Sequence, residues 1–145
     1  EKTDELITKL GDAIKNDPEN EIFLIIRGTL YYQIKNYKLS EADFKKVIEI
    51  DPNNLDANYT LGNIFVVYAN KIEDKSNKTN DNNKYEKLRK ESKNTFKKSL
   101  TYLEKAYEID SENKKIVNLL KQIYYKVGDY KKSEEMKMKS VELNK

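Results

Sequence analysis

The chain has 145 residues, a formal net charge of +3, and no cysteine or histidine; 28 Lys and Arg residues stand against 25 Asp and Glu residues. This composition excludes disulfides, thiolate metal sites and His-based acid–base catalysis, and its interleaved charges indicate a solvated surface, not a nucleic-acid-binding face. No apolar run approaches the roughly 20 residues of a membrane span. Only 4 Gly and 2 Pro residues interrupt long helix-forming stretches, so we expect an all-α protein with no catalytic residues, metal ligands or cofactor.

Hydrophobic periodicity and turn residues predict seven helices. The first, at about 3–16, has no partner helix before it. Three pairs follow, at 21–35 with 38–50, at 55–74 with 83–109, and at 113–127 with 130–143. Asp51-Pro52 ends one helix because a residue before proline disfavours the α region. Asn53 and Asn54 then supply turn and capping groups for the next helix.

Similar residues recur along the chain after 34 positions, which is the period of a helical repeat. A second spacing of 59 exceeds that period by 25, so one repeat carries an insertion of about 25 residues. The pairs that are 34 apart are Asp17-Pro18 with Asp51-Pro52, Gly28 with Gly62, Tyr31 with Phe65, and Phe96 with Tyr130; those 59 apart are Tyr37 with Phe96, Phe44 with Leu103, and Phe65 with Tyr124.

These residues resemble the tetratricopeptide repeat family, whose unit is a pair of antiparallel helices over about 34 residues. The family's glycine is matched by Gly28, its small residue by Ser40 and its closing proline by Pro52. All three lie in the segment IRGTLYYQIKNYKLSEADFKKVIEIDPNN. In the last repeat Lys121 replaces the glycine. The resemblance implies a right-handed superhelical array of antiparallel helix pairs, a tetratricopeptide-like α-solenoid of about three and a half repeats.

The expected organisation is a single domain over 1–145. Residues 1–18 form the second helix of a truncated repeat, 19–52 a repeat, 53–111 a repeat with an insertion near 71–95, and 112–145 a last repeat with a polar terminal cap. We expect the insertion to lengthen both helices of its repeat into a protruding hairpin that turns at residues 80–83. Together with the segment KKSLTYLEKAYEIDSEN, it resembles insertion-bearing repeat proteins of the Bacteroidota, which favours the periplasm or cell envelope over the cytoplasm.

The family resemblance implies a concave groove, lined by the first helix of each pair, that binds a peptide or protein segment. The residues expected to line it are Ile25, Thr29, Tyr32, Tyr59, Asn63, Val66, Asn118, Gln122 and Tyr125. Tyr supplies contact area at low entropic cost, and Asn and Gln can hydrogen-bond an extended backbone. A chaperone carboxylate clamp is excluded, because Ile25 and Leu119 stand where a Lys and an Arg would be needed.

The function predicted from these features is a non-catalytic scaffold for a protein or peptide partner, with no nucleic acid and no membrane span. Two other interpretations stay open. Ile22 and Ile25 can instead cover an upstream helix that is missing here. The chain can also be a structural, self-associating subunit, a homo-oligomer formed through its open N-terminal edge or through the hairpin.

Overall fold

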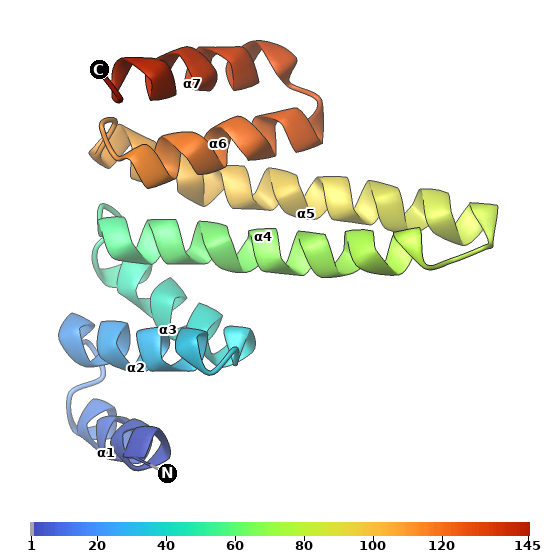
Figure 1. Ribbon diagram of the computed structural model, residues 1–145. Helices are drawn as coiled ribbons and strands as arrows, with labels where there is room; N and C mark the ends of the chain where they lie inside the picture. The colour runs from blue at the N-terminus through green and yellow to red at the C-terminus, as the bar shows by residue number, and fades with distance from the viewer. Residues whose placement is uncertain (1) are drawn as a thin grey trace. The chain divides into compact units, whose positions relative to one another are not determined.

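The computed structural model describes residues 2–145, and in this range every regular element is an α-helix (Figure 1). The all-α fold class is therefore confirmed. The helices in chain order are α1 (Lys2–Asn16), α2 (Glu21–Gln33), α3 (Tyr37–Ile50), α4 (Leu55–Asn77), α5 (Asn82–Ile109), α6 (Lys114–Val127) and α7 (Tyr130–Glu142).

Most of these helices begin at an Asn or Asp cap, whose side chain accepts a hydrogen bond from a free backbone N–H of the first turn. The Asn20 side chain accepts from the Phe23 N–H at 3.2 Å, and the Asp81 side chain accepts from the Lys84 N–H at 2.9 Å. The caps are Asn20, Asn36, Asp81, Asn113 and Asp129. The short polar residues between the predicted helices thus set where each helix starts.

The chain divides into two compact units, one ending at Leu61 and one covering Gly62–Lys145. The first holds α1, α2, α3 and the start of α4, and its core is formed where α2 packs against α3. Leu24 and Val47 are fully buried there. Ser40 donates its hydroxyl to the Gly28 carbonyl at 2.8 Å, and the absent side chain of Gly28 leaves room for the Phe44 ring. The repeated Gly therefore lets these two helices approach closely.

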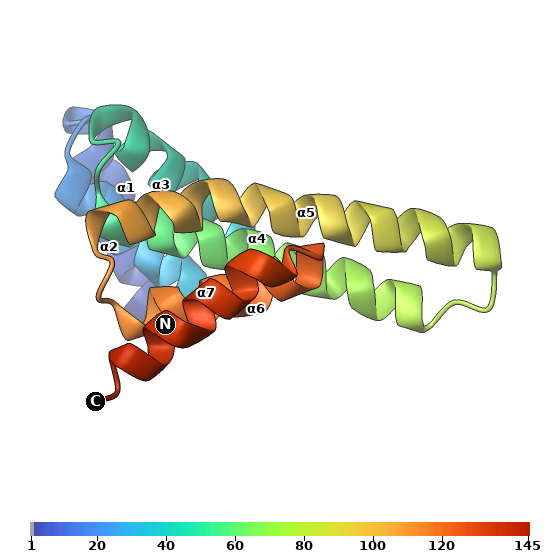
Figure 2. The ribbon, with the colours of Figure 1, turned by 90° about the horizontal axis from the view of Figure 1, so that it is seen from above.

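The second unit holds the rest of α4 together with α5, α6 and α7. Its core includes the fully buried Ile64 and Leu103 and the almost fully buried Leu120. The long helices α4 and α5 run beside each other, and their far ends extend beyond the turn that joins α6 to α7 (Figures 1 and 2). Ser92 on α5 donates to the Ala69 carbonyl on α4 at 2.9 Å, which ties this extension together.

Two helices, α2 and α4, end more than one residue away from the positions expected from the sequence, 35 and 74. Helix α2 stops at Gln33, not near 35, because Lys35 adopts a left-handed conformation with φ 62°. Gly128 holds a similar conformation, φ 86°, at the matching place between α6 and α7. Ala69 occupies this place in the repeat with the insertion, but it lies inside α4, which continues to Asn77. The long hairpin thus arises where the other two repeats make their turn.

Candidate functional site

Among residues 2–145, no group of three or more Asp and Glu side chains is placed to hold a metal ion. Each helix of this range is too short or too polar to span a bilayer. The residues that the repeat pattern predicts for a groove lie on helices of both units.

The predicted groove residues of the first unit lie on α2 and at the start of α4. Ile25 and Tyr32 are half-buried on α2, Thr29 is exposed, and Tyr59 is half-buried on α4. The rings of Tyr32 and Tyr37 meet edge to face, with centroids 5.4 Å apart. Burial raises the pKa of Tyr32, and the neighbouring Tyr37 and Tyr59 raise it further. The fold thus gathers three tyrosines into one patch, of which the sequence predicted two as site residues.

The predicted residues of the second unit do not all present free polar groups. Asn63 and Val66 are half-buried on α4. Asn118 accepts a hydrogen bond from the Ser140 hydroxyl of α7 at 2.9 Å, so its amide oxygen is engaged within the protein. Gln122 and Tyr125 are exposed on α6 and line the same pocket of about 450 Å³. The structure therefore joins Gln122 and Tyr125, and the role of all nine residues in binding stays a prediction.

Tyr125 also pairs with a residue that the sequence analysis did not select. Its ring meets that of Tyr130, the first residue of α7, edge to face at 5.4 Å. The two rings are 65% and 64% exposed. The pair matches Tyr32 and Tyr37 in the first unit, with the same five-residue separation across the turn between two paired helices. The recurrence of an aromatic residue at one repeat position, Tyr37 and Tyr130, is the sequence signal that could have identified both.

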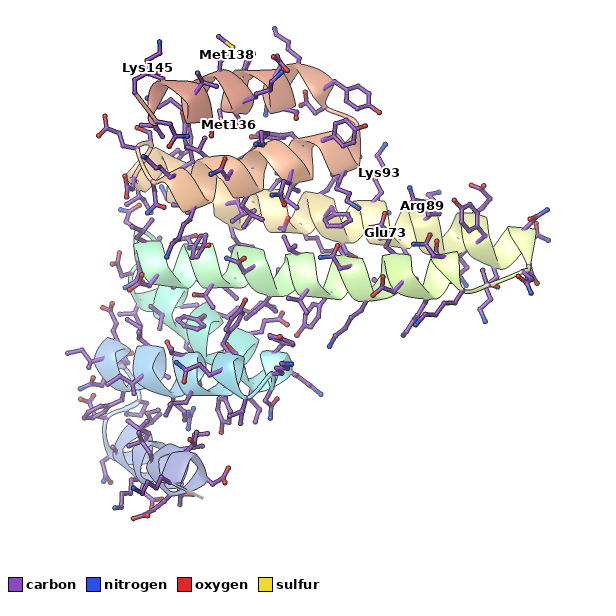
Figure 3. All side chains as sticks on the ribbon, in the orientation of Figure 1. Glu73, Arg89, Lys93, Met136, Met138 and Lys145 are labelled. Carbon is purple, nitrogen blue, oxygen red and sulfur yellow. The ribbon has the colours of Figure 1, made fainter. Side chains whose placement is uncertain are left out.

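The second unit holds a further polar cluster, at the side of the hairpin, that the sequence did not reveal. Glu73 on α4 accepts hydrogen bonds from Arg89 on α5 at 2.5 Å and from Lys126 on α6 at 2.6 Å. Figure 3 shows Glu73 and Arg89 between the two long helices, and Lys93 extending from α5. Arg89 and Lys126 lie 16 and 53 residues from Glu73 in sequence, so no local pattern could have joined them.

The electrostatics of Glu73 follow from this geometry. Its side chain is only 15% exposed, and burial alone raises its pKa. The hydrogen bonds from Lys126 and Arg89, together with their charges, outweigh burial and hold the pKa of Glu73 below its ordinary value. Glu73 is therefore a carboxylate at neutral pH, and it fixes two cationic side chains from different helices against the hairpin.

Comparison with known proteins is consistent with this architecture. Residues 23–54 match the family model described as tetratricopeptide repeat, while no curated protein sequence matches the chain. The solved structure described as "MamA 41-end from Desulfovibrio magneticus RS-1" is similar over 99% of this chain and 67% of that one, at 20% identity and a TM-score of 0.71. The structure described as "MamA RS-1 ArsTM double mutant" is similar over 99% of this chain and 66% of that one, at 20% identity and a TM-score of 0.73. The chain thus spans about two thirds of the length of these proteins.

A third structure, described as "Human IFIT1 dimer with m7Gppp-AAAA", is similar over 91% of this chain and 28% of that one, at 15% identity and a TM-score of 0.69. At these identities the likeness concerns the fold alone. These matches do not show the narrower resemblance to proteins of the Bacteroidota, which stays a prediction. The chain carries a tetratricopeptide repeat at residues 23–54, and its all-α fold is that of helical-repeat solenoids.

Proposed function

We propose that this chain is a non-catalytic scaffold that binds peptide segments of other proteins. The binding surface is the exposed face of the first helix of each pair in its tetratricopeptide-like solenoid fold. Stacked helical repeats commonly serve as protein-interaction scaffolds. The observation that carries the proposal is the recurrent tyrosine pair at the turn between paired helices. Tyr32 and Tyr37 form it in the first unit, and Tyr125 and Tyr130 form it in the second.

The chemistry of these pairs suits peptide binding. A tyrosine ring offers a large, rigid contact area with few rotatable bonds, and its hydroxyl can hydrogen-bond a peptide backbone. In the second unit the exposed Gln122 amide lies in the same pocket as the Tyr125 ring, and it can both donate to and accept from an extended peptide. Each unit therefore presents apolar area and hydrogen-bonding groups together, as binding hot spots require.

A pull-down with Tyr59→Ala/Tyr125→Ala tests the proposal, followed by isothermal titration with the partner segment that the wild-type chain recovers. We expect both changes to weaken binding, because each removes contact area in one unit. Tyr85→Ala is the matched control, since Tyr85 is exposed on the hairpin and belongs to neither tyrosine pair. The proposal fails if the double variant recovers and binds the segment as well as the wild type does.

A second candidate function is a self-associating structural subunit, and one observation favours it. Ile22 and Ile26 lie one turn apart on α2 and are 66% and 41% exposed, and Leu6 on α1 is 44% exposed. Exposed aliphatic side chains of this kind on one unit are a feature of protein interfaces. Light scattering on the wild type and on Ile22→Lys/Ile26→Lys decides the point: a dimer that becomes a monomer supports self-association, and a wild-type monomer rules it out.

A further inference from the structure

A pocket of about 340 Å³ lies in the second unit where the hairpin passes the turn between α6 and α7. Its walls come from α4 and α5 on one side and from the end of α6 and the start of α7 on the other. Residue Lys93 of α5 reaches across to Gly128, where a β-carbon would lie 3.5 Å from its Nζ atom. The insertion therefore builds one wall of a pocket that an uninterrupted repeat would not have.

The charges that line this pocket do not balance. Four cationic side chains, Arg89, Lys90, Lys93 and Lys126, stand against the two carboxylates of Glu73 and Glu86. Arg89 and Lys126 are both engaged by Glu73. Lys90 and Lys93 lie three residues apart on adjacent turns of α5, and within residues 2–145 neither forms an ion pair. The lining thus has a net charge of +2, and its two unpaired ammonium groups lie on one side.

The opposite side of the pocket is aromatic. Tyr125 and Tyr130 are both largely exposed and are held together by their edge-to-face contact. Phe96 lines the pocket from α5, the helix of the two lysines; it is only 2% exposed, and the Lys126 ammonium lies 5.7 Å from the centre of its ring. Apolar area and positive charge are therefore presented at one place, at a size in the range of protein ligand pockets.

We infer that this pocket receives an acidic segment of a partner protein. A carboxylate of the segment pairs with Lys90 and Lys93, and an adjacent apolar side chain packs on Tyr125 and Tyr130. A peptide fits the pocket better than a nucleic acid does. Glu73 and Glu86 on the lining repel a continuous phosphate backbone, whereas a peptide can place its carboxylates on the lysine side only. The inference deepens the proposed function at Tyr125 and Tyr130, on which it rests for the apolar contact, and does not depend on binding by Tyr32 and Tyr59.

The test uses fluorescence anisotropy with a labelled, Glu-rich peptide that has a central Phe, titrated with the whole chain. We expect saturable binding that weakens with added salt. Lys90→Ala/Lys93→Ala should raise the Kd about tenfold, because an exposed ion pair contributes about threefold and two are lost. Glu86→Gln should lower the Kd about twofold to threefold, because it removes a repelling carboxylate from the lining.

Lys87→Ala/Lys98→Ala is the matched control. It removes the same charge from exposed positions of the same helix, but neither residue lines the pocket. Binding that falls equally in the control and in Lys90→Ala/Lys93→Ala reflects net charge alone and overturns the inference.

Two further arms separate the remaining outcomes. A Lys-rich peptide of equal length should not bind, and an oligoadenylate RNA that binds as tightly as the acidic peptide would overturn the choice of partner. Absence of saturable binding by the acidic peptide overturns the site itself. Tyr32→Ala/Tyr59→Ala should leave acidic-peptide binding unchanged, so failure of this site and failure of the proposed groove can be told apart.

Discussion

Replacing Gly62 by Ala should destabilise the protein, although Ala is the better helix former. A β-carbon at Gly62 would lie 2.5 Å from both Cγ and Cδ2 of Leu103, about 1 Å closer than the optimum for two carbon atoms. Leu103 is fully buried, so it cannot move toward solvent to relieve the contact. Overpacking of a core costs about 1–3 kcal/mol, or more when the neighbour cannot shift, and the gain in helix propensity offsets about 1 kcal/mol.

We therefore expect Gly62→Ala to lower the free energy of unfolding by about 2 kcal/mol, which corresponds to a fall in Tm of about 6 °C for a chain of this size. Urea and thermal denaturation followed by circular dichroism measure both quantities. Gly11→Ala is the control inside the chain. The nearest atom to a β-carbon at Gly11 is Arg27 Nη1 at 3.6 Å, an ordinary contact, so this change should stabilise by up to about 1 kcal/mol.

A double-mutant cycle with Leu103→Ala isolates the steric cause. Leu103→Ala alone leaves a cavity and should cost about 2–5 kcal/mol, but it also removes the atoms that the new β-carbon of Gly62→Ala would strike. The double variant should then be more stable than the sum of the two single effects allows, by about 1 kcal/mol or more. Additive effects, or a Gly62→Ala protein that is stabilised as Gly11→Ala is, would refute the reasoning.

Three other changes test separate features by denaturation. Lys35→Gly should stabilise the protein by about 0.5–1 kcal/mol. Lys35 has the left-handed φ of 62°, and removing that strain should gain more free energy than the extra backbone entropy of glycine costs. A lower Tm of this variant would contradict the prediction. Arg27→Met should cost about 3 kcal/mol by leaving the carboxylate of Asp43, only 5% exposed, without its bidentate partner, and Arg27→Met/Asp43→Leu should recover most of the loss. The pKa of Glu73 is lowered in the folded state, so its ionised side chain stabilises the protein above the ordinary pKa of 4.5, and this effect is lost as the pH falls through the folded-state pKa. The difference in unfolding free energy between the wild type and Glu73→Gln should therefore shrink as the pH is lowered below 4.5. A difference that stays constant with pH argues against the cluster.

The candidate sites could be predicted only in part. Tyr32 and Tyr125 were selected because each occupies a fixed place in the repeat, and both lie in aromatic pairs. Asn118 was selected by the same rule, but its amide is engaged by Ser140 of α7. The repeat position of a residue indicates the helix face on which it lies, whereas the hydrogen bonds that it makes depend on side chains of another helix, here a serine 22 residues later in the sequence.

The sequence by itself determined the elements of this protein. The 34-residue period, the Asn and Asp caps and the two Asp-Pro pairs are local signals, and the predicted helix ends lie within three residues of those observed. Only the tertiary structure decided how charges are paired and where pockets form. Glu73, Arg89 and Lys126 come from three helices, so their meeting depends on how α4, α5 and α6 pack against one another. Separation along the chain carries no information about such contacts between helices.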